Sequence, residues 1–338
     1  MKNKKLKTPL FATIFAMAAL LLLALAITAQ CVCAYYDGVV RDFLGVIGET
    51  RVREAHDGLN KNYYLSDYES IDKLNEYERR LVREIGGEGY VLLKNAGGGK
   101  GLPIATEKND KTKLSLFSHS SVDLIAGGTG SGTGSSDVDL KTALEACDYK
   151  VNGVLWDFYL TGNGSSYKRG PGSVNYGHGK EDWRINECPL SVMRKEKGLL
   201  QSAVGTKAIF VLARTGGEGR DLARGMQEHT GLTEDKNKHY LEPDSVELEI
   251  ISYLNENFDD VILLVNTNNA PELGWVENYS SITAVLWVPG GGGETASSVA
   301  DIVCGKVNPS GRLVDTLAYD AFSSPAMANF GDIRYCIG

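Results

Sequence analysis

The residues best suited to chemistry lie in one short stretch, Arg214–Asp221, with the sequence RTGGEGRD. Its only glutamate, Glu218, stands between glycines and closely follows the apolar run 208–213. Such a run predicts a strand buried on both faces of a parallel sheet, and ligands of open parallel sheets bind at the carboxyl ends of the strands. Glycines leave room for a substrate beside the acid, and nearby charges shift the pKa of a carboxyl group. The nearby charged residues are Arg214, Arg220 and Asp221. Alone, the octapeptide favours a simpler interpretation, a glycine-rich turn with solvated charges.

A second glycine-rich stretch, Gly127–Gly134, follows one predicted strand and precedes a helical segment. Backbone amides at a helix N-terminus attract anions, so this position suggests a phosphate or dinucleotide site. No frame of the stretch gives G-x-G-x-x-G, however, and no lysine completes a P-loop. The sequence therefore favours a flexible loop at the rim of the sheet.

Several function classes are disfavoured by what the chain contains. The formal charge is −8, without a basic run beyond the N-terminus, which argues against a nucleic-acid partner. The five histidines lack the spacing of a metal site, and no G-x-S-x-G elbow is present for a serine hydrolase. The six cysteines show neither zinc nor redox spacing, so we expect the buried ones to act as small apolar residues. An exported location permits disulfides, but nothing in the sequence pairs these cysteines.

The N-terminus predicts a membrane anchor. Residues 1–9 form a basic tail, and residues 10–36 carry no charge over a length sufficient for a helix to span a bilayer, roughly 20 residues. Lysines stay on the cytoplasmic side, which places the rest of the chain at the cell surface. A cleaved signal peptide is the alternative, because 24–26 (Ala-Leu-Ala) resembles a cleavage site. The length of the run favours the uncleaved anchor, and the polar residues 37–67 are interpreted as a stalk.

The remainder, 68–338, alternates short apolar runs with helical patterns. Strands are predicted at 90–93, 114–117, 208–213, 261–265 and 284–288. Helices are predicted from residue 71 to the glycines at 86–87, from the capping box Asp244/Glu247 onward, and at about 294–304. The polar segment 152–188 predicts a long loop region near the functional face. Alternating elements of this kind predict an α/β fold, an open three-layer α/β/α sandwich with a mostly parallel sheet, here preceded by a transmembrane helix.

Taken together, these segments resemble the C-terminal α/β domain of glycoside hydrolase family 3, the β-glucosidase family. The resemblance spans about residues 70–335, and its motifs, each weak alone, occur in the family's order. The motifs are GYVLLKN (89–95) with LPI (102–104), the octapeptide 214–221, WVPG (287–290), ADIV (300–303) and NPSGRL (308–313).

The resemblance implies a role for each residue that it aligns. In the family, a glutamate of the α/β domain is the general acid/base of many β-glucosidases, and it corresponds to Glu218. Residues expected to bind substrate or support the loops are Arg214, Gly217, Arg220, Asp221, Gly130 and Ser131. The implied substrate is a β-linked oligosaccharide or glucoside, and neither metal nor cofactor is implied.

The resemblance also implies a partner domain. The family's nucleophile is an aspartate on a separate (β/α)8 barrel, and retaining hydrolysis needs two carboxyl groups about 5 Å apart. One branch of the family places a membrane anchor first, the α/β domain next and the barrel last, and the sequence VDT at 314–316 fits that branch. The chain stops at Gly338, before a barrel. We therefore expect the barrel in cis or in trans, and little activity from this chain alone.

The sequence thus predicts the acid/base-carrying domain of a retaining β-glycosidase that acts in carbohydrate metabolism. A non-catalytic, membrane-anchored carbohydrate-binding or scaffold module has the same fold and remains the alternative. A nucleotide-binding domain of flavodoxin-like type rests on fold and glycine loops alone.

Overall fold

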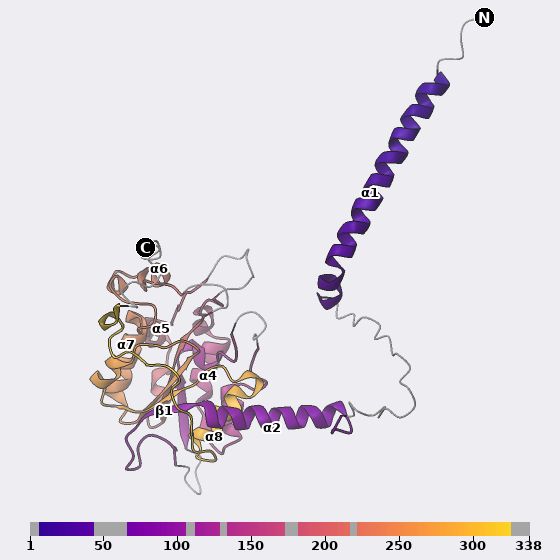
Figure 1. The fold of residues 1–338 in the computed structure, drawn as a ribbon. Coiled ribbons are helices and arrows are strands. Elements are labelled where there is room, and N and C mark those ends of the chain that lie inside the picture. The colour runs from indigo at the N-terminus through magenta and orange to yellow at the C-terminus, as the bar shows by residue number, and fades with distance from the viewer. Residues whose placement is uncertain are drawn as a thin grey trace, which may run out of the picture. The chain divides into compact units, whose positions relative to one another are not determined.

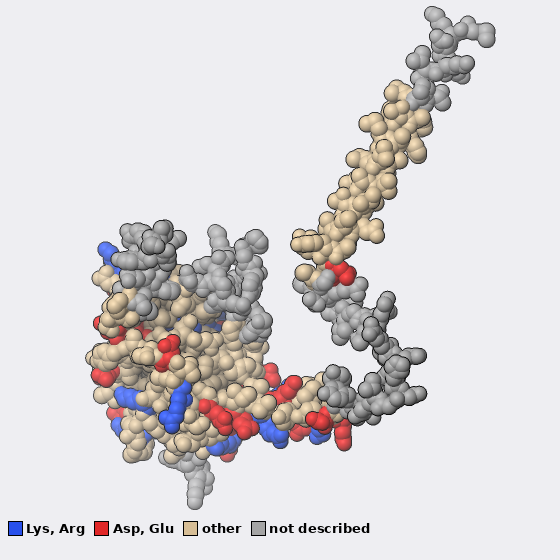
Figure 2. All heavy atoms as spheres, in the orientation of Figure 1, with Lys and Arg blue, Asp and Glu red and all other residues tan. Residues whose placement is uncertain are grey.

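The computed structural model describes residues 7–43, 66–105, 112–128, 134–172, 182–216 and 222–325. The chain divides into two units, 1–67 and 68–338. In the first, α1 (Lys7–Phe43) is a single helix, and an 18-residue window within its segment Leu10–Asp37 has a mean hydropathy of 2.7 and no buried residue. Figure 2 shows this helix without charged side chains along most of its described length. Its length and composition allow it to cross a membrane, and a signal sequence would have the same properties.

The second unit is built on a six-stranded sheet, with the order β1-β6-β5-β4-β2-β3. The strands are β1 (Val91–Asn95), β2 (Lys113–Phe117), β3 (Lys150–Val151), β4 (Lys207–Arg214), β5 (Val261–Thr267) and β6 (Ile282–Trp287). Only the edge strand β1 runs antiparallel to its neighbour β6, and the other four pairings are parallel. The predicted mostly parallel sheet is therefore confirmed.

Helices cover both faces of this sheet, which makes the three layers (Figure 1). Along β4, Ile209 and Val211 point into one core, while Phe210 and Leu212 point into the other. The first core is covered by α2 (Ile71–Gly89), α3 (Leu140–Glu145) and α8 (Thr295–Val303). The second is covered by α4 (Gly153–Leu160), α5 (Leu190–Lys195) and α7 (Ser245–Asn257), and the short α6 (Gln227–Thr230) lies between β4 and α7 in sequence.

Helix α2 differs from its sequence pattern in how it packs. Gly86 and Gly87 lie inside the helix and are buried, whereas Tyr77, Leu81 and Ile85 on its apolar stripe are exposed. The glycines let the backbone approach α8 and the following loop, because a Cβ on Gly87 would lie 2.8 Å from Val307 Cγ1. The contact with the sheet layer is therefore made by the carboxyl end of α2, beside α8 (Figure 1).

Two further sequence predictions have clear outcomes. The capping box of α7 is formed, with the Asp244 carboxylate accepting from the Glu247 amide at 2.7 Å and the Asp244 amide donating to Glu247 at 2.8 Å. The prediction that 152–188 is a long loop was wrong at its start, because α4 occupies Gly153–Leu160. This helix buries Leu155, Trp156, Phe158 and Tyr159. A helix this apolar lacks the polar face that would have marked it in the sequence.

Candidate active site

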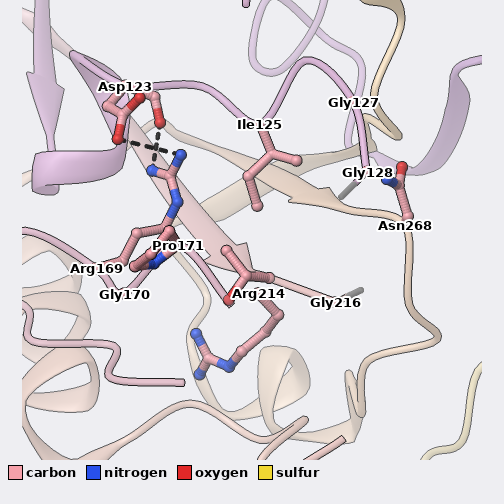
Figure 3. Close-up of a pocket in the computed structure, with 11 residues that line it drawn as sticks. Asp123, Ile125, Gly127, Gly128, Arg169, Gly170, Pro171, Arg214, Gly216 and Asn268 are labelled. Carbon is pink, nitrogen blue, oxygen red and sulfur yellow. Dashed lines mark hydrogen bonds and ion pairs between the residues drawn. The ribbon is translucent and has the colours of Figure 1, made fainter. Parts of the chain in front are cut away.

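A pocket of about 260 Å³ opens where the loops that follow β2, β4 and β5 meet. This is the carboxyl edge of the parallel strands, where ligands of open α/β sheets bind. The loop after β4 contributes Thr215 and Gly216, and the segment 169–171 forms the neighbouring wall (Figure 3). The remaining lining residues are Asp123, Ile125, Gly127, Gly128, Arg214 and Asn268.

Arg214 ends β4 and supports the pocket from below its surface. It is 1% exposed, and its guanidinium pairs with both carboxylate oxygens of Glu247, Nη1 to Oε1 at 2.8 Å and Nη2 to Oε2 at 2.6 Å. Its Nε donates to the carbonyl of Tyr240 at 2.8 Å, and Nη2 also donates to the carbonyl of Glu242. Figure 3 shows the guanidinium directed away from Asp123 and Ile125. Of the two roles expected for Arg214, this geometry favours loop support.

The Arg214–Glu247 pair also changes the ionisation of its neighbours. Burial lowers the pKa of the guanidinium, but the Glu247 carboxylate outweighs that effect, so the pKa of Arg214 lies above its usual value. Burial and the same Glu247 charge raise the pKa of Asp244 to about 8. Arg214 therefore stays charged, and its pairing fixes the end of β4 to the N-terminus of α7.

A run of polar residues at the end of β5 connects the loops around the pocket. The Asn266 side chain is fully buried; it accepts from the Ile125 amide at 2.6 Å and donates to the carbonyls of Ile125 and Val288 at 3.0 Å each. Thr267 Oγ1 donates to the carbonyl of Arg214 at 2.9 Å, and the carboxamide of Asn268 accepts from the Gly290 amide at 2.7 Å. These side chains hold the loops after β2, β4 and β6 at fixed positions around β5.

The charged wall of the pocket is made by Arg169 and Asp123. Arg169 Nη2 lies 3.2 Å from Asp123 Oδ2, and Nη1 also donates to the Asp123 carbonyl (Figure 3). Burial lowers the pKa of Arg169, and the Asp123 carboxylate opposes that shift. A guanidinium held in this way presents a fixed positive charge and hydrogen-bond donors to the pocket.

Below this wall, a buried carboxyl group supports the turn after β2. Ser118 has a φ of 80°, a conformation that non-glycine residues rarely adopt, and its hydroxyl donates to Glu187 Oε2 at 2.5 Å. Glu187 Oε1 accepts from the Cys188 amide at 2.9 Å and from the His119 amide at 3.4 Å. Burial raises the pKa of Glu187 to about 7, and burial lowers that of the neutral His119 to about 4. The turn that leads to Asp123 thus depends on a carboxyl group that titrates near neutrality.

Most of the site residues predicted from sequence lie outside the described residues. These are Gly217, Glu218, Arg220 and Asp221 after β4, with Gly130 and Ser131 after β2. The described ends of both stretches, Gly216 and Gly128, line the same pocket.

Asp123, Arg169 and Asn266 are not among the residues predicted from the sequence, although they line or support the pocket. For Asn266 a signal was present, since the sequence NTNN directly follows the apolar run of β5. Arg169 lies in the polar segment 152–188, where nothing in the sequence distinguishes it from its neighbours.

Comparison with known proteins identifies relatives of this fold and sequence. Residues 90–333 match the model described as the glycosyl hydrolase family 3 C-terminal domain. A β-glucosidase of Ruminococcus albus is 30% identical over 258 residues, which are 76% of this chain and 24% of that enzyme. β-Glucosidase A of Butyrivibrio fibrisolvens is 28% identical over 259 residues, 72% of this chain and 29% of that enzyme. The chain thus spans less than a third of the length of either relative.

Solved structures agree with the sequence relatives. A β-glucosidase from Paenibacillus barengoltzii is 28% identical with a TM-score of 0.58, covering 75% of this chain and 25% of that one. β-Glucosidase 3B from Thermotoga neapolitana, solved with glucose, has a TM-score of 0.55 at 23% identity, which supports the fold. That alignment covers 77% of this chain and 33% of the Thermotoga chain.

Proposed function

Because the chain belongs to glycoside hydrolase family 3, we propose that it carries the general acid/base of a retaining β-glycosidase, with Glu218 in that role. The observation that carries the proposal is the position of Thr215 and Gly216, which line the pocket three and two residues before Glu218. In this proposal, the carboxyl group of Glu218 protonates a leaving oxygen and then activates water. The relatives named above are β-glucosidases, which supports a β-glucoside or a β-linked oligosaccharide as substrate.

The second carboxyl group of the reaction comes, in this proposal, from a (β/α)8 barrel domain, in the same polypeptide or in a separate one. Asp221 is only three positions from Glu218 and has the loop-support role in the family resemblance. A retaining mechanism needs a nucleophile about 5 Å from the acid/base, on the other side of the scissile bond. The α/β domain then supplies one wall of the sugar site, and the barrel supplies the other.

The test compares Glu218→Gln with wild type after each is joined to the barrel domain of a related β-glucosidase. The general acid matters most when the leaving group is poor, so kcat/KM for an alkyl β-glucoside should fall about 10²–10⁴-fold. The loss should be much smaller for a dinitrophenyl β-glucoside, whose leaving group needs no proton. Glu234→Gln, at an exposed glutamate 16 positions later in the sequence, is the matched control and should keep wild-type rates.

Two results would count against the catalytic role. Equal losses on both substrates would mean that Glu218 does not act as a proton donor. Glucoside binding without turnover in every combination with a barrel would favour the non-catalytic carbohydrate-binding module.

We also propose that α1 anchors the protein, with the N-terminal lysines in the cytoplasm and the residues after Phe43 outside. The support is the apolar helix itself, together with the charge bias of Lys2, Lys4 and Lys5. Protease added to intact cells should remove the α/β domain and spare an N-terminal tag. Release of the α/β domain by an alkaline carbonate wash would contradict anchoring and favour a cleaved signal.

A further inference from the structure

Two cysteines that are far apart in sequence meet on the face of the sheet covered by α3 and α8. Cys147 follows α3 and is buried, and Cys304 caps the C-terminus of α8 and is partly exposed. The two Sγ atoms and a carboxylate oxygen of Asp301 all lie within 4.8 Å of one another. Cys147 precedes β3 by only a few residues, which places the cluster near the amino ends of the strands, at the edge opposite the pocket.

The surroundings of the two thiols are positively charged. Lys306 Nζ lies 3.4 Å from Cys147 Sγ and 3.9 Å from Asp301 Oδ1. Arg83 donates to both oxygens of Asp301, with Nη2 2.7 Å from Oδ1. A divalent cation bound by these three ligands would have to displace both side chains from the carboxylate. The cluster is therefore poorly suited to holding zinc.

From this arrangement we propose that Cys147 and Cys304 are a redox-active pair, which closes to an intramolecular disulfide when the folded protein meets a small-molecule disulfide. The proposal is independent of the function proposed above. The two Sγ atoms already lie within 4.8 Å of each other, where α3 and α8 are in contact. Closure then requires side-chain rotation and a small approach of the backbones.

The chemistry proceeds in two exchange steps. The thiolate of Cys304, the more exposed thiol, attacks the external disulfide, forms a mixed disulfide and releases one small thiol. The Cys147 thiolate then attacks Cys304 Sγ in that mixed disulfide and releases the second small thiol. The protein loses two electrons and two protons, and the external disulfide is reduced to two thiols. Burial raises the pKa of Cys147 to about 11, which the Lys306 ammonium opposes, so the second step depends on Lys306.

The experiment treats the full chain in detergent with oxidised glutathione, then quenches with acid, alkylates and maps the peptides. In the folded protein we expect a cross-linked peptide pair that contains Cys147 and Cys304. When the protein is oxidised in denaturant instead, this pair should form no more often than other cysteine pairings. Cys188→Ser is the control, because Cys188 is buried in the other core. It should form the link as wild type does.

Single variants test the order of the steps. Cys147→Ser should accumulate a glutathione adduct on Cys304, whereas Cys304→Ser should leave Cys147 largely unmodified because it is buried. Lys306→Gln should form the adduct at the normal rate and close it on the order of tenfold more slowly, since the thiolate has lost its ammonium partner.

Two results would overturn the proposal. One is the absence of the Cys147–Cys304 link in protein whose near-UV circular dichroism is native. The other is stoichiometric zinc that remains with the reduced wild type through gel filtration and is lost from both cysteine variants. The second result would identify a metal site in place of a redox pair.

Discussion

The buried carboxyl group of Glu187 gives the sharpest prediction, a pH dependence of stability that one substitution removes. Its pKa of about 7 in the fold stands against a usual value of 4.5, because burial disfavours the carboxylate. The folded state thus binds a proton that the unfolded state has released. Below pH 4.5 both states are protonated and burial carries no electrostatic penalty. As the pH rises from 4.5 to 7 stability is lost, and above 7 the whole penalty applies.

The size of this change in the free energy of unfolding follows from the two pKa values of Glu187, about 7 in the fold and 4.5 in the unfolded chain. At about 1.4 kcal/mol per pKa unit, ionisation of Glu187 costs the folded protein about 3 kcal/mol at pH 8 relative to pH 4. Glu187→Gln keeps the shape of the side chain, and its carbonyl oxygen still accepts from the amides of His119 and Cys188. The variant should therefore gain about 3 kcal/mol on wild type between pH 4 and pH 8.

The prediction is a difference between wild type and Glu187→Gln, because other groups titrate in the same pH range and affect the stability of both proteins. Burial lowers the pKa of His119 to about 4, so its contribution to stability is lost as the pH falls through 6.5 to 4, which is the opposite sign. Asp244, with its pKa raised to about 8, changes in the same direction as Glu187. Both groups are present in wild type and in Glu187→Gln, so their contributions cancel in the difference.

The assay is urea unfolding of the full chain in detergent, followed by tryptophan fluorescence at pH values from 4 to 8. Glu234→Gln, which alters an exposed carboxylate, should give a difference from wild type that stays near zero at every pH. A difference between Glu187→Gln and wild type that is flat with pH would show that Glu187 does not titrate in the fold. A gain for the variant at low pH that disappears at high pH would reverse the sign and refute the reasoning.

Three other substitutions test buried contacts of the domain, two beside the pocket and one at the C-terminus of α8, each by the free energy of unfolding in urea. Arg214→Met leaves the Glu247 carboxylate buried without its partner and should cost about 3–5 kcal/mol, whereas adding Glu247→Leu should recover a large part of that loss. A single substitution that costs under about 1 kcal/mol would mean that the pair is not buried in solution. Asn266→Ala removes three buried hydrogen bonds and should cost about 2–4 kcal/mol. An unchanged urea midpoint would argue against the network around β5. Gly305→Ala places a Cβ 2.8 Å from that of Pro103 at a φ of +75°, and should cost about 1–2 kcal/mol. A stabilised variant would contradict the left-handed backbone at this position.

The layered fold could be predicted because the strands of this sheet are buried on both faces. A run such as 261–265 needs no alternation to be recognised, since every side chain enters one core or the other. The cap of α7 was equally predictable, because Asp244 and Glu247 satisfy backbone groups within their own turn. Features determined by neighbours in sequence were within reach of sequence analysis.

Features that depend on contacts between distant parts of the chain could not be predicted from the sequence. The apolar stripe of α2 predicts a helix, but it does not predict which side of the helix packs against the domain. In the structure, the buried glycines Gly86 and Gly87 make that contact, and the stripe is exposed. Helix α4 exposes the apolar residues Val154 and Leu160, so its hydrophobic residues show no helical period in the sequence. Arg169 becomes part of the pocket only because it pairs with Asp123, which lies 46 positions earlier in the sequence. Cys147 and Cys304 likewise meet only after α3 and α8 have packed on the same face of the sheet.

The buried polar groups of this domain are distributed in a way that bears on Glu218. Asn266, Thr267 and Arg214 lie at the carboxyl ends of β5 and β4, and their hydrogen bonds go largely to loop carbonyls and amides. Burying so many polar groups is costly unless each is paired, and a domain needing only stability would place apolar residues there. The pairing fixes the end of β4 at Arg214, directly before Thr215. In the proposed function, Glu218 follows this fixed strand end by four positions in the sequence, and an acid/base must be held to within a fraction of an ångström to transfer a proton efficiently.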